Sequence, residues 1–248
     1  MDISQPIVQT YDKSFGLSKD KPLVISLGGS LVIPNSGMDT KFLAQFNNFI
    51  RQKIAQGWRF FIVVGGGATA RHYIEEAQKI AGHITDWDLD FLGIHATRLN
   101  AHLMRTIFQD VAHPRIIANY EKKITQLKQP LVIAAGWKPG FSTDYDAVIL
   151  ARDYGAQAVI NMSNITQVFE KDPKKFPDAR PLHNLTWEEF EKIVGNKWSP
   201  GSNLPFDPVA TKLAKELKIS VYVVGSDLNN LENVIAGKIF LGTVISPS

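Results

Sequence analysis

The sequence of 248 residues contains no cysteine, which excludes disulfide bonds and thiolate metal sites. It also contains no apolar run near the roughly 20 residues that a membrane-spanning helix needs. The segment from Met1 to Gln5 lacks the basic and apolar regions of a signal peptide. Together these absences predict a cytoplasmic protein that does not act at a membrane.

An excess of charge of one sign is missing as well. The net charge is +3, with 27 basic and 24 acidic residues spread along the chain, which favours an ordinary solvated surface over a nucleic-acid footprint. The six histidines form no ligand pair of the H-E-x-x-H type. We therefore expect small-molecule substrates, no nucleic-acid partner and no metal site built from protein side chains.

What is present is an alternation of short β-branched runs with longer amphipathic stretches, a pattern typical of an α/β fold with parallel strands and helical crossovers. Strands are predicted at 23–27, 60–64, 115–118, 130–135, 158–161, 167–170, 219–224 and 239–245. Helices are predicted at 39–56, 69–81, 88–112, 144–154, 186–194 and 207–217.

The domain organisation follows from a smooth change of composition near residue 155, where no linker-like stretch interrupts the chain. We predict a single domain over 1–248 whose two lobes, 21–155 and 156–248, share one sheet. Residues 1–20 are polar and are predicted to form an N-terminal extension.

Glycine-rich loops directly follow three of the predicted strands, at 28–30, 65–67 and 136–144. In a parallel sheet such loops gather at the carboxyl edge, where ligands bind. Glycine lets backbone N–H groups approach an anion, and a following helix N-terminus adds a favourable dipole. With Arg71 and Lys138 nearby, the loops predict a phosphate site, although neither a P-loop nor a Rossmann fingerprint is present.

The predicted helix at 88–112 carries Asp90, Gly93, Thr97 and Asn100 on one face. Two interpretations remain open for this polar stripe. It could be a satisfied contact between helices, or it could offer a carboxylate to a ribose diol and hydroxyl or amide groups to a phosphate.

Six segments carry a resemblance to a known family. They are Leu27–Ser30, Val64–Ile74, Asp90–Gly93 with Thr97–Ala101, Pro139–Asp144, Val168–Pro173 and Phe206–Pro208. In these segments, which keep the family order across residues 23 to 245, the chain resembles the uridylate kinases of the amino-acid kinase superfamily, especially the archaeal-type branch.

The resemblance implies a three-layer αβα sandwich with a mainly parallel central sheet. It also implies transfer of the γ-phosphate of ATP to UMP, with Mg²⁺ as cofactor and UDP and ADP as products. Members of the family are commonly hexameric, so a homo-oligomer is expected.

The resemblance also assigns site residues. The predicted acceptor side comprises Gly66, Asp90, Thr97 (from the polar helix face), Lys138, Pro139, Gly140, Phe141, Ser142, Thr143 and Asp144. The predicted ATP side comprises Gly29, Ser30, Gly67, Arg71, Asn164, Phe169 and Asp172. The predicted catalytic residues are Arg71, Asp207 and Lys138, with Arg71 preferred as the cation because its forked donors suit a phosphate.

The chain departs from the family pattern at three places. Many relatives have a lysine two residues before the first glycines, whereas this chain has Ser26, predicted to be half-buried. The family's Val-Asp-Gly before the adenine strand is replaced by Ile165-Thr166-Gln167. The loop at 198–202 has no assigned role.

These departures leave two alternatives to a UMP kinase. One is a kinase of the same fold that acts on a carboxylate, a carbamate or an isoprenoid phosphate. The other is a nucleotide- or oxyanion-binding protein without turnover.

Overall fold

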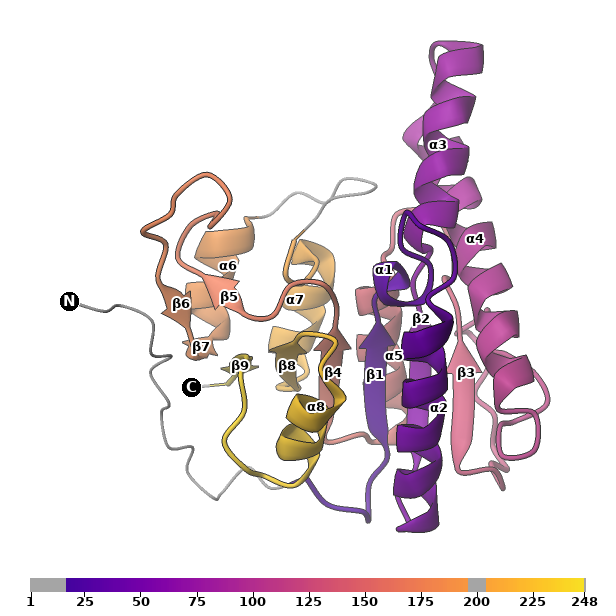
Figure 1. The fold of residues 1–248 in the computed structure, drawn as a ribbon, viewed down its shortest axis with the longest axis vertical. Helices are drawn as coiled ribbons and strands as arrows, with labels where there is room; N and C mark the ends of the chain where they lie inside the picture. Colours follow the sequence, from indigo (N-terminus) through magenta and orange to yellow (C-terminus); the bar gives the residue numbers. More distant parts are fainter. Residues whose placement is uncertain (1–16, 196–203, 248) are drawn as a thin grey trace.

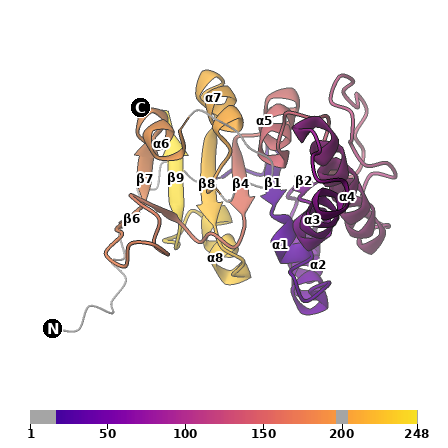
Figure 2. The same ribbon diagram turned by 90° about the horizontal axis from the view of Figure 1, so that it is seen from above.

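The computed structural model describes residues 17–195 and 204–247. A seven-stranded sheet forms the middle layer, and helices cover both of its faces (Figures 1 and 2). The strand order is β3-β2-β1-β4-β8-β9-β7, and β5 and β6 pair separately. The predicted three-layer α/β architecture is therefore confirmed.

The strands of the central sheet are mostly parallel, and their residues are mostly buried. They are β1 Leu23–Leu27, β2 Phe60–Val64, β3 Leu131–Ala134, β4 Ala158–Met162, β7 Asn184–Thr186, β8 Ser220–Val224 and β9 Thr243–Ser246. Strands β1, β2, β3, β4 and β8 run parallel to their neighbours in that group, and β9 is antiparallel to β8. The small sheet consists of β5 Val168–Phe169 and β6 Pro181–Leu182.

Eight helices lie within the described residues. They are α1 Gly29–Val32, α2 Thr40–Ala55, α3 Gly67–Ala81, α4 Asp86–Ile107, α5 Thr143–Tyr154, α6 Trp187–Val194, α7 Pro208–Glu216 and α8 Leu228–Ile235. One sheet face packs on apolar residues of α2, α4 and α8, and the other packs on α5, α6 and α7. Helix α3 extends beyond the sheet at its carboxyl edge (Figure 1).

Helix ends follow the local chemistry of the sequence. Asp39, Thr85 and Ser142 begin α2, α4 and α5 by accepting a backbone N–H of the first turn. Thr186 and Glu189 form a capping box at the start of α6. Gly155 ends α5 with a left-handed φ of 66°.

Three details differ from the sequence-based predictions. Residues 115–118 do not form a strand, since this segment makes only an isolated bridge from Ile117 to Ala134. Helix α4 ends at Ile107 rather than at residue 112, because the chain turns at Phe108 and brings Ala112 beside Leu131. Helices α1 and α8 and strands β6 and β7 were not predicted.

Both predicted lobes contribute strands to the same central sheet, with β4 from the second lobe beside β1 from the first. Over the described residues, we find no helix with the length and apolar character to cross a membrane. The predicted extension at 1–20 falls almost wholly, and the loop at 198–202 entirely, outside the described residues.

The loops after β1 and β2 are in backbone contact. A Cβ atom on Gly29 would overlap the backbone of Gly65 and Gly67. Gly67 has a left-handed φ of 63°, and a side chain there would overlap the carbonyl of Gly29. Glycine is therefore required at both positions so that the two loops can meet.

We expect Gly29→Ala to lower the melting temperature, because no flexible side chain can move to relieve the overlap with backbone. The cost should reach several kcal/mol, within the range for severe backbone strain and overpacking. Gly93→Ala is the matched control, since Gly93 lies in α4 with open space around it. That change should be neutral or slightly stabilising, because alanine favours a helix more than glycine. Equal melting temperatures for the two variants would contradict the prediction.

Candidate phosphate-binding cleft

A cavity of about 760 Å³ opens at the carboxyl edge of the sheet. All three glycine-rich loops line it, as their positions after parallel strands predicted. The first two loops supply backbone N–H groups and lead into α1 and α3. This is an arrangement that can bind phosphate groups.

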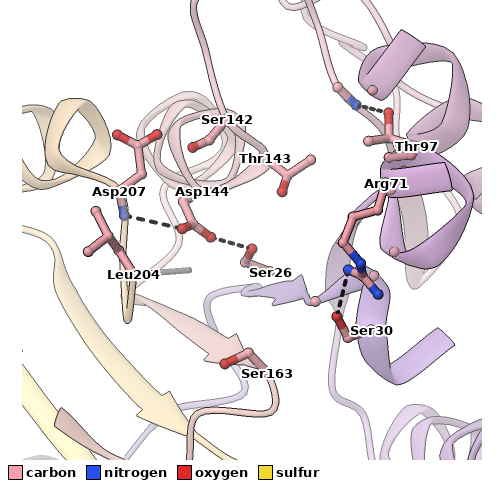
Figure 3. A pocket seen from close by; sticks show the side chains of 18 of the residues that line it. Ser26, Ser30, Arg71, Thr97, Ser142, Thr143, Asp144, Ser163, Leu204 and Asp207 are labelled. Atoms are coloured by element: carbon pink, nitrogen blue, oxygen red, sulfur yellow. Dashed lines mark hydrogen bonds between the residues drawn. The ribbon is translucent and has the colours of Figure 1, made fainter. Parts of the chain in front are cut away.

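Arg71 provides the positive charge on this side of the cavity. Its Nη1 atom donates to Ser30 Oγ at 3.3 Å and its Nη2 atom to Asn35 Oδ1 at 2.9 Å. These contacts hold the guanidinium against the first loop, as Figure 3 shows for Ser30. No carboxylate contacts Arg71 within the described residues, so its charge is available to an anionic ligand.

The third loop is attached to α4 through side chains of the polar stripe. Asp90 Oδ2 accepts the Gly140 N–H at 2.8 Å, and Thr97 Oγ1 accepts the Gly136 N–H at 2.8 Å. Burial raises the pKa of the Asp90 carboxyl above its usual value. Asn100 donates to the carbonyls of Gly65 and Gly66 at 2.9 and 3.0 Å. Thr97 and Asn100 therefore make structural contacts, although the Oδ1 atom of Asn100 is buried without a hydrogen-bond partner. Asp90 and Thr97 also line the cavity.

Asp144 and Asp207 are in contact where they line the cavity, and we call this part of the cavity its floor. Asp144 Oδ1 accepts the hydroxyl of Ser26 at 2.8 Å, and Asp144 Oδ2 accepts the backbone N–H of Asp207 at 3.3 Å (Figure 3). Ser26 is 2% exposed, so the sequence-based prediction of a half-buried serine was wrong. Asp207 caps α7 through Oδ1, while its Oδ2 atom is buried without a hydrogen-bond partner.

The surroundings of Asp144 disfavour the ionised form of its carboxyl group. Burial, with a further contribution from the nearby Asp207 charge, raises the pKa of Asp144 to about 7. The Ser26 hydroxyl acts in the opposite direction but supplies no positive charge. An Asp144 carboxyl with this pKa is partly protonated near neutral pH.

Most of the predicted site residues line the cavity. These are Gly29, Ser30, Gly66, Gly67, Arg71, Asp90, Thr97, Phe141, Ser142, Thr143, Asp144, Asn164 and Asp207.

Five predicted site residues do not line it: Lys138, Pro139, Gly140, Phe169 and Asp172. The Lys138 ammonium lies 4.0 Å from the centre of the Trp137 ring and lines a second cavity with Arg98. Phe169 lies on β5, and Asp172 accepts the Lys174 N–H in a turn that follows. Pro139 is buried.

The cavity also contains residues that the sequence did not single out, among them Asn35, Asn161 and Ser163. Asn35 lies beyond α1, and its role depends on a contact with Arg71 across 36 positions. Asn161 and Ser163 are at the carboxyl end of β4, next to β1. Their position at a strand end is the signal that could have indicated them.

The model of the family described as "Amino acid kinase family" matches residues 21–225. The chain belongs to the amino acid kinase family. The uridylate kinase of Pyrococcus abyssi is 34% identical over 229 residues, which cover 91% of this chain and 99% of the relative. The uridylate kinase of Sulfolobus acidocaldarius is 34% identical over 211 residues, covering 83% and 91%. The predicted resemblance is confirmed.

Solved structures of the family agree with the fold. The crystal structure of uridylate kinase from Archaeoglobus fulgidus superposes with a TM-score of 0.77 at 32% identity, covering 91% of this chain and all of that one. The UMP kinase of Bacillus anthracis gives a TM-score of 0.72 at 21% identity, covering 91% and 96%. At that identity the second match supports the fold alone.

The raised pKa of Asp144 predicts a pH-dependent stability. A carboxyl whose pKa is higher in the folded than in the unfolded protein stabilises the fold at low pH, and this contribution is lost as pH rises through about 7. Asp144→Asn keeps an acceptor for Ser26 but cannot ionise. We therefore expect the variant to gain stability relative to wild type between pH 5 and pH 8, measured by urea unfolding. A difference that does not change with pH would contradict this.

Proposed function

We propose that this chain is a uridylate kinase that transfers the γ-phosphate of ATP to UMP, giving UDP and ADP. The observation that carries the proposal is the division of one cavity into two sides that meet at a common floor. Arg71 and the first two glycine loops form one side, and Asp90 with the third loop forms the other. The curated relatives named above, which are uridylate kinases, support UMP as the acceptor.

The ATP phosphates are assigned to the side formed by Gly29, Ser30, Gly67 and Arg71. Asn164 is assigned to the adenosine end of the same side, because it lies at the end of β4 within the cavity. Phe169 and Asp172 are retained as adenine-side residues on the family resemblance, although their side chains do not line the cavity.

The acceptor is assigned to the side formed by Gly66, Asp90, Thr97 and the third loop. Asp90 can accept from a ribose hydroxyl through the carboxylate oxygen that does not contact Gly140. Phe141, Ser142, Thr143 and Asp144 contribute the rest of this side. Lys138, Pro139 and Gly140 then act by shaping the loop.

The chemistry needs no general base, because an oxygen of the acceptor phosphate is already ionised at neutral pH. Catalysis then consists of holding the two phosphates in line and offsetting the charge on the transferring group. The N–H groups of Gly28 and Gly65 already donate to the carbonyls of Met162 and Leu27. The other N–H groups of these loops and the Arg71 guanidinium would supply the donors to the phosphates. The Asp207 backbone at the start of α7 fixes Asp144 at the floor.

Magnesium fits this arrangement when it arrives with the nucleotide. Within the described residues, no group of three or more acidic or histidine side chains could hold a metal ion. Mg²⁺ usually binds through substrate phosphates, water and one or two carboxylates. Asp207 would face the hydrated ion, because its Oδ2 atom has no partner. The bound ion would offset negative charge on the phosphates.

An ADP-release assay with Mg²⁺ over UMP, CMP, dTMP and AMP tests the function, with UMP expected to be preferred. In that assay Arg71→Ala should lower kcat by about 10²- to 10³-fold, as for loss of a transition-state donor. Arg71→Lys should recover only part of the rate, because lysine lacks the fork of donors. Lys138→Ala tests the competing assignment of the cation. Its ammonium lies over Trp137 outside the cavity, so the loss in kcat should be much smaller than for Arg71→Ala.

Loss of turnover in Lys138→Ala, with a normal rate in Arg71→Ala, would exchange the roles of the two cations. ATP binding by the wild type without phosphate transfer to any monophosphate would instead favour a binding protein without turnover. Turnover only with a carboxylate, carbamate or isoprenoid phosphate would identify a different acceptor.

A homo-oligomer, of the hexameric type suggested by the family resemblance, is also proposed. Its support is α3, in which Ala68 alone is buried among 15 residues. Tyr73 and Ile80 are 64% and 85% exposed, seven positions apart on this helix. An isolated helix of this length is only marginally stable in water. The cytoplasmic location stays a prediction of the sequence.

We expect the mass in solution, measured by light scattering, to be a multiple of the 27.6 kDa chain. Ile80→Asp should shift it toward the monomer, because a charge would replace an apolar contact. Gln78→Asp, at an exposed neutral position on the same helix, controls for the addition of one negative charge. A wild-type protein that is monomeric at micromolar concentration would contradict the proposal.

A further inference from the structure

The backbone of one residue in the third loop, Trp137, is held by side chains on both sides, at its N–H and at its carbonyl. The N–H of Trp137 donates to Asp146 Oδ2 at 3.1 Å, and its carbonyl accepts Arg98 Nη2 at 3.0 Å. Asp146 comes from the first turn of α5, and Arg98 comes from the middle of α4. We propose that Asp146 is a positioning residue for the acceptor, acting with Arg98 to clamp the backbone of Trp137 at its N–H and its carbonyl and so fix the loop.

Aromatic contacts connect Trp137 to the lining of the cavity. The Trp137 ring stacks on Phe141 with centroids 5.9 Å apart, and Phe141 lies 4.4 Å from Tyr145. Phe141 lines the cavity, whereas Asp146 and Arg98 do not. A shift of the Trp137 backbone would therefore act on Phe141, on the side of the cavity assigned to the acceptor.

An aspartate is energetically unfavourable at this buried position of α5, which argues against a purely structural role for Asp146. It is 0% exposed, and its Oδ1 atom is buried without a hydrogen-bond partner. Burial raises the pKa of this carboxyl well above its usual value, and the charges of Asp207 and Asp144 act in the same direction. Arg98 opposes them, and Tyr120 is the other titratable group that interacts with Asp146. An apolar residue of similar size would avoid these costs.

What Asp146 provides is an acceptor at a defined point. The loop has two further attachments, from Thr97 to Gly136 and from Asp90 to Gly140, and both come from α4. Asp146 attaches the loop to α5 instead, between these two points. The loop is therefore held by side chains from two helices, α4 and α5.

The test compares Asp146→Val, which removes the acceptor, with Asp146→Asn, which retains it. Asp146→Val should raise the KM for UMP by about tenfold, which corresponds to the loss of one hydrogen bond. The KM for ATP and the melting temperature should change little or not at all. Hydrogen exchange of the Trp137 amide should become faster. Asp146→Asn should resemble wild type in all four measurements.

Tyr154→Phe is the matched control. Tyr154 also lies on α5, and its hydroxyl accepts a loop backbone N–H, that of Ile124, at 2.9 Å. Its loss should leave both KM values unchanged. If Asp146→Val fails to fold, Arg98→Met opens the clamp from the other side and should give the same selective rise in the KM for UMP.

A wild-type KM for UMP and slow Trp137 exchange in Asp146→Val would overturn the proposal. An equal defect in Asp146→Asn would do so too, because that result would make the charge, not the acceptor, the important property. The effect on the acceptor rests on the proposed kinase function, whereas the exchange measurement does not. A wild-type protein without UMP turnover would therefore refute the function and leave the clamp to be decided by exchange alone.

Discussion

The backbone contact between the loops after β1 and β2 is the constraint on which the site depends. Gly29 lies against Gly65 and Gly67 with no space for a Cβ atom between them. The contact is possible because β1 and β2 are parallel neighbours in register, which brings their carboxyl ends to the same level. Two sets of N–H groups then share one small volume, and this concentrates donors where phosphate groups can be bound.

Charge is distributed unevenly around that volume. Among the residues that the structure describes, Arg71 donates to two neutral oxygen atoms, of Ser30 and Asn35, and to no carboxylate. Its positive charge is therefore not neutralised by these contacts. Asp144 and Asp207 line the opposite side, and Asp146 lies behind them outside the cavity. Burial and the charge of Asp207 raise the pKa values of Asp144 and Asp146, and the charge of Asp144 raises that of Asp146 further. An anionic ligand is therefore attracted by the positive charge of Arg71 on one side of the cavity. On the other side, the raised pKa of Asp144 lets this carboxyl hold a proton, which lowers the negative charge there.

The strands, the glycine loops that follow them and their common edge could be predicted from the sequence, because they depend on local patterns. Buried strands that end in glycines have a strong signature, and their common edge follows from parallel topology. The positions of Lys138 and Asn35 could not be read in this way. Proximity in the sequence placed Lys138 at the site, but its ammonium rests on Trp137 instead. Asn35 reaches Arg71 only through tertiary packing, and Asp146 appeared as an ordinary helix residue until its partners were known.

Ser26 shows how a departure from the family pattern changes the balance of the site. A lysine at this position would place a cation between the floor carboxylates and the phosphates, whereas the serine hydroxyl gives Asp144 one hydrogen bond and no charge. The negative charge of a phosphoryl group in transfer must still be offset. In the proposed mechanism, Arg71, the loop N–H groups and an ion carried by the nucleotide supply this offset among the described residues. The side assigned to ATP would then provide the positive charge, and the side assigned to the acceptor would contribute position, through the hydrogen bonds that attach its loop to α4 and α5.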